Sequence, residues 1–320
     1  MINGILNVYK EKGYTSHDVV AKLRGILGQR KIGHTGTLDP DAEGVLPVCL
    51  GKATKVCDLL AEKDKVYETV LLLGKVTDTQ DVTGTVLEEG EVSCSKEQVW
   101  ETIQQFVGSC QQIPPMYSAL KVNGKKLCDL ARAGIEVERK PREIQIFSIQ
   151  IQETALPRVK MQVHCSKGTY IRTLCHDIGK ELKCGGCMES LLRTRVAGFE
   201  LKDARKLEEI EKLALEARER KQREIESLAR AELSKEDLQG FIQNTDCVFQ
   251  QYPALLVKPK YFKLLSNGNP LKREWMQEWK QEYEEGWLRI YDENQLFAGI
   301  YQWEKERKDL RPIKIFMDDP

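Results

Sequence analysis

The chain has 320 residues, and its 49 lysine and arginine side chains balance 49 aspartate and glutamate side chains, so the formal net charge is zero. This balance argues against a uniformly basic nucleic-acid coat and against an acidic, self-repelling disordered chain. Hydrophobic residues make up 41% of the chain, enough for a core, and the length suggests about two domains. The apolar runs are short, such as VLLL at 70–73, and the N-terminus lacks the layout of a signal peptide, so we expect no membrane span and a cytoplasmic location.

The N-terminal part of the chain predicts a strand, a helix and a glycine-rich loop in succession. Residues 5–10 predict a strand, and Ser16 is placed to cap a helix whose apolar residues recur with helical spacing. These apolar residues are Val19, Val20, Leu23, Ile26 and Leu27. The stretch 33–51 predicts a loop that leads into a short strand, followed by a helix near 53–63 and a strand over 66–73.

The middle of the chain carries helix, hairpin and strand signals. Ser95 with Gln98 makes a capping box for a helix that runs to about residue 108. Asn123-Gly124 marks a hairpin, which precedes a short helix. The other predicted elements are that helix over 127–133, strands over 144–152 and 158–165, and a helix from near Thr169 to 183.

The composition changes twice in the last third of the chain. Residues 203–237 are rich in Glu, Lys, Arg, Ala and Leu without Gly or Pro, which predicts a charged and largely exposed helix. After Pro253 come short apolar segments, the turn SNGNP at 266–270 and four of the five tryptophans. We therefore place a domain boundary between 238 and 252.

Local charge differs from the neutral total. Segment 121–142 holds seven basic and three acidic side chains, and segment 158–195 holds eight basic and three acidic ones. Such surpluses suit a face that binds a polyanion. The alternative, in which these basic residues are neutralised by acidic neighbours in the fold, is equally open at this stage.

The most unusual segment runs from Lys31 to Gly44 and reads KIGHTGTLDPDAEG. Its glycines allow a ligand to approach the backbone closely, and its polar side chains would be displayed to that ligand. Asp39 lies between Leu38 and Pro40, which would shield it in part and present it rigidly. Because Asp-Pro is also a common start of a turn, Asp39 is either a turn residue or a reactive group.

Several familiar site types are excluded by the sequence. LPVCLGKA at 46–53 resembles a phosphate-binding loop but lacks its first glycine and its Ser/Thr after the lysine. The one CxxC, Cys184 to Cys187, supplies two of the four ligands of a closed zinc site, and neither a zinc-deaminase motif nor a Gly-x-Ser-x-Gly motif is present. The ten scattered cysteines suit reduced thiols. We expect no metal and no organic cofactor, which leaves an enzyme with a carboxylate nucleophile or a binding protein.

Five long motifs follow one another at fitting spacing: GHTGTLDPDAEGVLPVCLGKATK, KVYE, IPPMYSALKVNGKKL, HCSKGTYIRTL and LLRTRVAGF. In this order they resemble the TruB-type tRNA pseudouridine synthases, and the resemblance covers nearly the whole chain. The segment after Pro253, with SNGNPL and WLRIYDENQLFAGIY, resembles the small RNA-binding PUA domain attached in that family. Coincidence would not produce so many long matches in one order.

The resemblance implies an α+β fold with two domains. Residues 1–245 would form a pseudouridine synthase domain with a mixed, largely antiparallel sheet flanked by helices, and residues 252–320 a small β-barrel PUA-like domain. The implied activity converts uridine 55 in the T arm of tRNA to its carbon-linked isomer by base flipping. The implied enzyme acts without cofactor, metal, guide RNA or membrane, and we expect a monomer.

Three residues take the family's catalytic positions. Asp39 stands for the essential aspartate of GHTGxLDP, and sequence leaves open whether it attacks the sugar, attacks the base or acts electrostatically. Arg172 of GTYIR can bind a carboxylate through two hydrogen bonds and favour its ionised form. Tyr67 of KVYE is placed to stack on the uracil and to help remove the proton from carbon 5. Read without the family, Arg172 is a surface arginine and Tyr67 a core aromatic residue.

Four further residues match substrate-side positions. His34 would fill the space left by the extruded nucleotide, Leu191 would pack on the base, and Tyr170 would line the same pocket. Lys10 lies in a segment that resembles Lys-Pro-x-Gly-x-Thr-Ser, with Glu11 in place of the proline. Lys10 therefore either supports the active-site loop or is a solvated lysine.

Segment 121–142 matches the insertion that grips the T arm in the family. Basic side chains there would contact phosphates, which gives affinity and salt dependence rather than sequence choice. The residues concerned are Lys121, Lys125, Lys126, Arg132, Arg139, Lys140 and Arg142.

Two alternatives to a stand-alone enzyme remain. A guide-RNA-dependent relative is disfavoured because the chain starts directly at the catalytic domain, without the extension that those relatives carry. A non-catalytic RNA-binding or RNA-folding protein is disfavoured by the intact set of Asp39, Tyr67 and Arg172, although RNA folding can coexist with catalysis.

Overall fold

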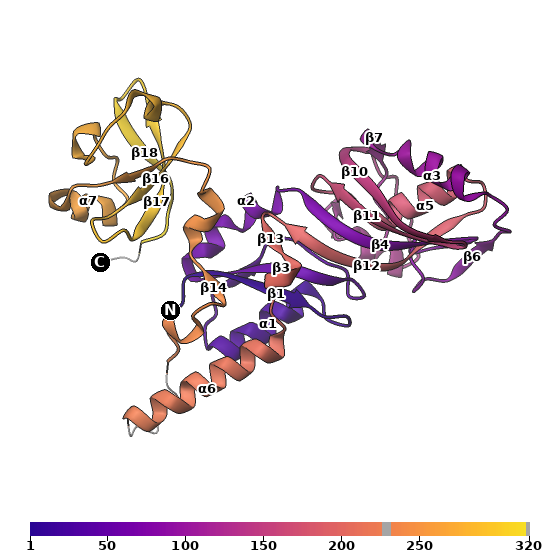
Figure 1. Cartoon of the computed structure of the whole chain (residues 1–320), viewed down its shortest axis with the longest axis horizontal. Helices are drawn as coiled ribbons and strands as arrows, with labels where there is room; N and C mark the ends of the chain where they lie inside the picture. The colour runs from indigo at the N-terminus through magenta and orange to yellow at the C-terminus, as the bar shows by residue number, and fades with distance from the viewer. Residues whose placement is uncertain (226–231, 318–320) are drawn as a thin grey trace.

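Figure 1 shows the computed structural model of the chain, which describes residues 1–225 and 232–317. A long sheet with helices packed against it forms the main body, and a smaller C-terminal sheet lies at one end. The predicted α+β class with a mixed, largely antiparallel sheet is confirmed. Among the helices in these two ranges, none has the length and apolar character needed to cross a membrane.

The large sheet has ten strands in the part of the chain that is described. Its order is β14 (Ile242–Gln243), β1 (Gly4–Lys10), β3 (Glu43–Leu50), β12 (Gly186–Val196), β4 (Lys65–Leu73), β11 (Arg158–Cys165), β10 (Arg142–Ala155) and β7 (Gly108–Gln112). Two short strands join it at the side, β2 (Ile32–His34) on β3 and β13 (Phe199–Glu200) on β12. Strands β3 and β12 pair in parallel, and the other pairs are antiparallel. This parallel contact joins the two halves of the sheet and sets the loop before β3 against β12.

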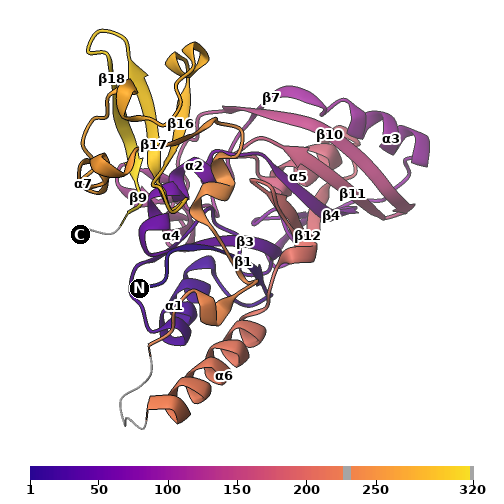
Figure 2. The same ribbon diagram turned by 60° about the vertical axis from the view of Figure 1, so that its left-hand side comes forward.

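Helices α1 (Ser16–Leu27) and α6 (Leu207–Ile225) lie side by side against the half of the sheet around β1 (Figure 2). The predicted apolar stripe of α1 is buried, as expected. The cap of α1 is Thr15 rather than Ser16, because the Thr15 side chain accepts a hydrogen bond from the Asp18 amide while Asp18 accepts one from the Thr15 amide. The Ser16 hydroxyl instead accepts a hydrogen bond of 2.9 Å from the Leu38 amide, which ties α1 to the glycine-rich loop.

The stretch 33–51 contains more strand than predicted. Strand β3 is eight residues long and almost entirely buried between β1 and β12, so strand pairing overrides its loop-like composition. The helix predicted near 53–63 is a 3-10 helix over Gly51–Val56 followed by the short helix α2 (Cys57–Ala61).

The charged segment 203–237 is helical only in part. Residues 203–206 precede α6, residues 226–231 lie outside the described ranges, and Glu236–Leu238 form a 3-10 turn, so the prediction was wrong at both ends. The expectation of a largely exposed helix is confirmed for α6, whose other face packs into the same core as α1. The buried residues on that face are Leu207, Ile210, Ala214 and Ala217.

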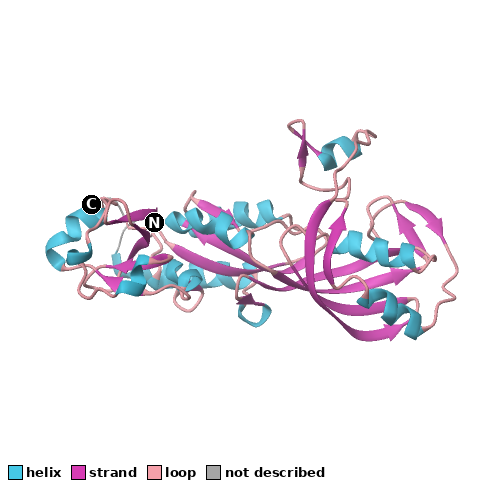
Figure 3. Ribbon diagram, turned by 90° about the horizontal axis from the view of Figure 1, so that it is seen from above, coloured by secondary structure: helices cyan, strands magenta, loops and turns pink. Residues whose placement is uncertain are grey.

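The other half of the sheet packs against α3 (Lys96–Gln104) and α5 (Ile171–Glu181). The capping box of Ser95 and Gln98 is confirmed, although α3 ends earlier than predicted because the chain turns into β7. Figure 3 shows helices on both sides of the strands. Two hairpins extend from this half: β5 (Lys75–Thr77) with β6 (Val86–Glu89), and β8 (Lys121–Val122) with β9 (Lys125–Lys126), which leads into α4 (Leu127–Arg132).

The C-terminal unit is a four-stranded sheet with its own core. Its order is β15 (Ala254–Leu256), β16 (Trp287–Tyr291), β17 (Phe297–Glu304) and β18 (Asp309–Ile315), with the short helix α7 (Phe262–Ser266) beside it. Ile300 of β17 and Phe316, which directly follows β18, pack in one apolar cluster with Ile5 and Val196 of the large sheet. The two units therefore share buried apolar surface.

Candidate active site

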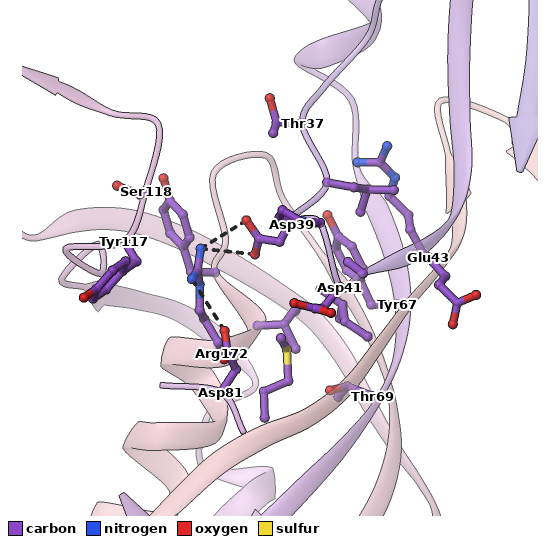
Figure 4. Close-up of a pocket in the computed structure, with 18 of the residues that line it drawn as sticks. Thr37, Asp39, Asp41, Glu43, Tyr67, Thr69, Asp81, Tyr117, Ser118 and Arg172 are labelled. Atoms are coloured by element: carbon purple, nitrogen blue, oxygen red, sulfur yellow. Dashed lines mark hydrogen bonds and ion pairs between the residues drawn. The ribbon is translucent and has the colours of Figure 1, made fainter. Parts of the chain in front are cut away.

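A pocket of about 1130 Å³ opens where the glycine-rich loop meets β4, β12 and the start of α5 (Figure 4). Seven of the residues predicted for the site line it: Asp39, Tyr67, Lys126, Arg132, Tyr170, Arg172 and Leu191. The fold thus brings together residues that lie more than 150 positions apart in the chain.

Backbone contacts hold the loop that carries Asp39. Leu38 is buried and bound to Ser16, and the Pro40 carbonyl accepts a hydrogen bond of 2.9 Å from the Gly13 amide. The ammonium group of Lys10, which is fully buried, donates to the carbonyl groups of Pro40 at 3.0 Å and Ala42 at 2.5 Å. Burial lowers the pKa of Lys10 to about 8, and Asp39 opposes this shift. Lys10 is not among the pocket-lining residues, so its contacts are those of a support for the loop.

Gly44 ends this loop and permits its close approach to β12. Its φ is +106°, and a β-carbon there would lie 2.2 Å from the backbone carbonyl oxygen of Arg193. Any side chain at this position would push the loop away from the strand.

Asp39 and Arg172 form an ion pair on one wall of the pocket. Nη2 of Arg172 lies 3.2 Å from Oδ1 and 3.1 Å from Oδ2 of Asp39. The Arg172 side chain is only 7% exposed, whereas 41% of the Asp39 side chain remains open to the cavity. Burial raises the pKa of Asp39, and the charge of Arg172 opposes that shift. The arginine thus holds the carboxylate in place and favours its ionised form while leaving it accessible.

A second carboxylate, Asp81, lies on the other side of Arg172. Its Oδ2 is 3.8 Å from Nη1 of Arg172, and its side chain is 15% exposed. Its Oδ1 accepts hydrogen bonds from Thr79 Oγ1 at 2.8 Å, from the Thr83 amide at 2.9 Å and from Thr83 Oγ1 at 2.5 Å. Asp81 was not among the residues predicted for the site, because nothing local in its turn indicates the distant arginine.

Tyr67 lies on β4, directly opposite Arg193 of β12 in the strand register. Tyr67 is 8% exposed and Arg193 is 1% exposed. Burial raises the pKa of Tyr67, while the positive charge of Arg193 opposes that shift. Arg193 was not predicted as a site residue, because only Leu191 of the motif LLRTRVAGF was assigned a role from the sequence.

The remaining substrate-side residues are divided between two hollows. Tyr170, at the start of α5, is fixed by two backbone hydrogen bonds with the Gln112 side chain, at 2.8 and 3.0 Å, and Leu191 on β12 is half-buried at the pocket wall. His34 does not line the large pocket. It lines a neighbouring hollow of about 520 Å³, together with His17, Arg24, Arg30 and Lys31, and its Nδ1 accepts a hydrogen bond of 3.3 Å from the Gly36 amide.

The basic residues predicted to contact phosphates are mostly exposed around α4 and the hairpin before it. Lys126 and Arg132 line the large pocket, whereas Arg139 turns inward and binds the Pro114 carbonyl at 3.2 Å and Glu136 at 3.2 Å. The exposed ones are Lys121, Lys125, Lys126, Arg132, Lys140 and Arg142. Within the described ranges, no group of three or more His, Cys, Asp or Glu side chains is arranged to hold a metal ion.

Comparisons with known proteins cover the whole chain. Residues 24–171 match the family profile "TruB family pseudouridylate synthase (N terminal domain)", and residues 172–249 match "tRNA pseudouridylate synthase B C-terminal domain". A tRNA pseudouridine synthase B of Lachnoclostridium phytofermentans is 48% identical over 99% of this chain and 100% of its own length. A protein of the same name from Clostridium perfringens is 40% identical over 99% of this chain and 100% of its own length.

Among solved structures, the chain is similar in fold to one from "Crystal Structure of a Cbf5-Nop10-Gar1 Complex". The TM-score is 0.70 at 24% identity, over 99% of this chain and 85% of that chain.

Proposed function

Since this chain belongs to the TruB family of pseudouridylate synthases, we propose that it is a tRNA pseudouridine synthase that isomerises uridine 55 in the T arm of tRNA. The observation that carries the proposal is the ion pair of Asp39 with Arg172, which presents a carboxylate to a pocket wide enough for a nucleoside.

The reaction exchanges one bond to the ribose for another. The bond from C1′ to N1 of the uracil breaks, the detached base turns, and a bond from C1′ to C5 forms. The proton on C5 leaves, and N1 gains a proton, so no electron is transferred and no outside atom is incorporated. The proposal therefore needs only groups that stabilise charge and move protons.

Asp39 is the group that acts on the detaching nucleoside. Its carboxylate, held by Arg172, can attack the sugar or the base, or stabilise the charge that develops at C1′ as the glycosidic bond breaks. Each of these roles requires an ionised carboxylate, and Arg172 supports that form against the effect of burial.

Tyr67 is the group that acts after the base has turned. Its ring forms part of the pocket wall, where a uracil can stack, and its hydroxyl is the polar group placed to help remove the C5 proton. A uridine paired or stacked inside an RNA arm is out of reach of these groups, so the base must first be extruded into the pocket. Leu191 and Tyr170 provide the apolar and aromatic walls that receive it.

RNA binding is assigned to the exposed cations around the pocket. Lys126 and Arg132 stand at its rim, next to the exposed Lys121 and Lys125 of the preceding hairpin. These side chains suit phosphate groups of the arm that carries the target uridine. The C-terminal sheet, 254–315, is proposed as a PUA-like module that adds RNA affinity.

The test is to incubate the protein with an unmodified tRNA transcript, without guide RNA, and to map pseudouridine nucleotide by nucleotide. We expect modification at position 55 alone, and none with Asp39→Asn, which should still bind the tRNA. Modification elsewhere would overturn the assigned position, and a requirement for an added guide RNA would overturn the stand-alone enzyme. Turnover by Asp39→Asn near that of the unsubstituted protein would overturn the role of Asp39.

A further inference from the structure

Arg193 is a buried charge for which the proposed mechanism has no use. It is 1% exposed and is among the largest fully buried side chains of the described residues. Removing a charged group from water costs several kcal/mol unless partners compensate. The charge or the hydrogen bonds of this arginine must therefore contribute to stability or to function enough to offset that cost.

The partners of Arg193 leave part of its guanidinium unused. Nε donates a hydrogen bond of 2.7 Å to the carbonyl of Val45, which lies in β3 directly after the glycine-rich loop. Nη2 is shielded from solvent and has no hydrogen-bond partner within the described parts of the chain. Tyr67 is the cross-strand partner of Arg193, and it opposes the lowering of the pKa of Arg193 that burial causes. Arg193 therefore faces Tyr67 where a carboxylate would be the ordinary partner.

Arg195, the next arginine on the same strand, is partly exposed and forms an ordinary ion pair with a carboxylate. Arg195 is 41% exposed, and its Nη2 lies 3.1 Å from a carboxylate oxygen of Asp64. If Arg193 served only to join β12 to the loop, an amide or an ammonium group would suffice for its single hydrogen bond to a carbonyl. The guanidinium adds a fixed positive charge beside the cross-strand partner Tyr67.

We propose that Arg193 is a positioning residue that orients the hydroxyl of Tyr67 and stabilises its anion, which then accepts the proton that leaves C5. This inference rests on the proposed role of Tyr67 in the reaction. Arg193 would act through Tyr67, without contact with the uracil.

The groups around Tyr67 support this assignment. Besides Arg193 on β12, they are Cys165 on β11 and Asp39 on the loop. Burial makes the largest contribution and raises the pKa of Tyr67, Cys165 and Asp39 raise it further, and Arg193 is the group whose charge lowers it. Without Arg193, every remaining influence in this set would favour the neutral hydroxyl.

The decisive experiment measures the ionisation of position 67 directly. Tyr67 is replaced by 3,5-difluorotyrosine, whose phenol ionises near neutral pH, and its ¹⁹F resonance is titrated in the full chain. In the Arg193→Gln background we expect the pKa at position 67 to rise by about one unit or more, because a nearby positive charge is lost. Arg195→Gln is the matched control and should leave the titration unchanged. An unchanged pKa in Arg193→Gln overturns the proposal.

Kinetics give a second readout. Arg193→Gln should lower the single-turnover rate at neutral pH about 10- to 100-fold while changing the dissociation constant for tRNA less than about twofold, with part of the rate recovered at higher pH. If Arg193→Gln does not fold, Arg193→Lys, which keeps the charge but not the planar fork, is used. It should give a displaced ¹⁹F signal and a lower rate, and values equal to those of the unsubstituted protein overturn the proposal.

The two proposals fail in different ways. If Tyr67→Phe retains full activity, the proposed role of Tyr67 fails, and the positioning role with it. If Tyr67→Phe is inactive but Arg193→Gln keeps both the rate and the titration of the unsubstituted protein, only the inference about Arg193 is wrong.

Discussion

Replacing Asp81 by asparagine tests whether Arg172 needs carboxylates on both sides. The substitution keeps the shape of the side chain, and the amide oxygen can still accept hydrogen bonds from Thr79 and Thr83, so the turn should keep its fold. What is lost is the negative charge 3.8 Å from the Arg172 guanidinium. Arg172 would then be held by Asp39 alone and would be free to follow it into the cavity.

The size of the effect follows from the distance. Two unit charges 3.8 Å apart attract by about 4 kcal/mol at an effective dielectric constant of about 20. The cost of burying both groups offsets part of this, which leaves about 1–3 kcal/mol for the pair. If that free energy stabilises the transition state, the rate should fall about 10- to 100-fold.

The pH dependence of the rate shows whether Asp81→Asn acts by displacing Arg172 or by changing the ionisation of Asp39. Asp81 raises the pKa of Asp39, so the asparagine variant should hold Asp39 ionised at lower pH than the unsubstituted protein does. The rate deficit should therefore persist at alkaline pH, where Asp39 is ionised in both proteins. A deficit that disappears as the pH rises would refute the argument from position.

The assay uses tRNA that carries tritium at C5 of uridine, because forming the bond to C5 releases that hydrogen to water. Single-turnover rates at saturating enzyme isolate the chemical step from tRNA binding. Asp78→Asn is the control: Asp78 is an exposed residue of the same turn whose Oδ1 accepts a hydrogen bond from the Thr85 amide at 2.8 Å. Equal rates for Asp81→Asn and Asp78→Asn would show that the second carboxylate is dispensable.

Three further predictions concern the surface and the loop. Changing Lys125 and Lys126 together to alanine should weaken tRNA binding and reduce the slope of log affinity against log salt by about 1–2, and an unchanged slope in a filter-binding titration would exclude their contact with phosphates. Lys10→Met should lower the melting temperature and the rate together, because the carbonyl groups of the loop lose their donor. Since burial lowers the pKa of Lys10 from 10.5 to about 8, the folded state loses this proton first, and the stability advantage of the unsubstituted protein over Lys10→Met should grow as the pH rises from about 8 to 10.5. Gly44→Ala should destabilise the protein far more than Gly13→Ala in urea unfolding, because both positions have a positive φ but only Gly44 lies against the backbone of β12; similar losses would contradict this.

Local patterns in the sequence predicted the elements whose stability is mostly local. The apolar spacing of α1 and the capping box at Ser95 lead directly to helices that the structure contains. The predicted cap at Ser16 was wrong by one residue, because two neighbouring hydroxyl groups compete for the cap and the Ser16 hydroxyl is bound by the Leu38 amide of a distant loop. Strand β3 was underestimated for a similar reason, since its pairing partners come from both ends of the domain.

Site residues could be predicted from the sequence when they lie within a family motif. Asp39, Tyr67 and Arg172 each lie within such a motif, and the structure places them at one pocket. Asp81 and Arg193 carry no local signal, because their partners are fixed by a turn and by the register of β4 with β12. The role of such charged residues depends on contacts between segments that are distant in the chain, so it cannot be predicted from the local sequence.

Although the net charge of the chain is zero, its basic side chains include two groups in different environments. Lys10, Lys65 and Arg193 are buried beside the site and direct their donors at backbone carbonyl groups, which offsets part of the cost of burying them. Lys65 and Arg193 line the pocket that holds Asp39, and Lys10 supports its loop, so their removal should change stability and catalysis together. The cations of 121–142 are mostly exposed, so their removal should change RNA affinity and its salt dependence while leaving the chemical step intact. Measuring melting temperature, affinity and single-turnover rate for one member of each group therefore tests the division directly.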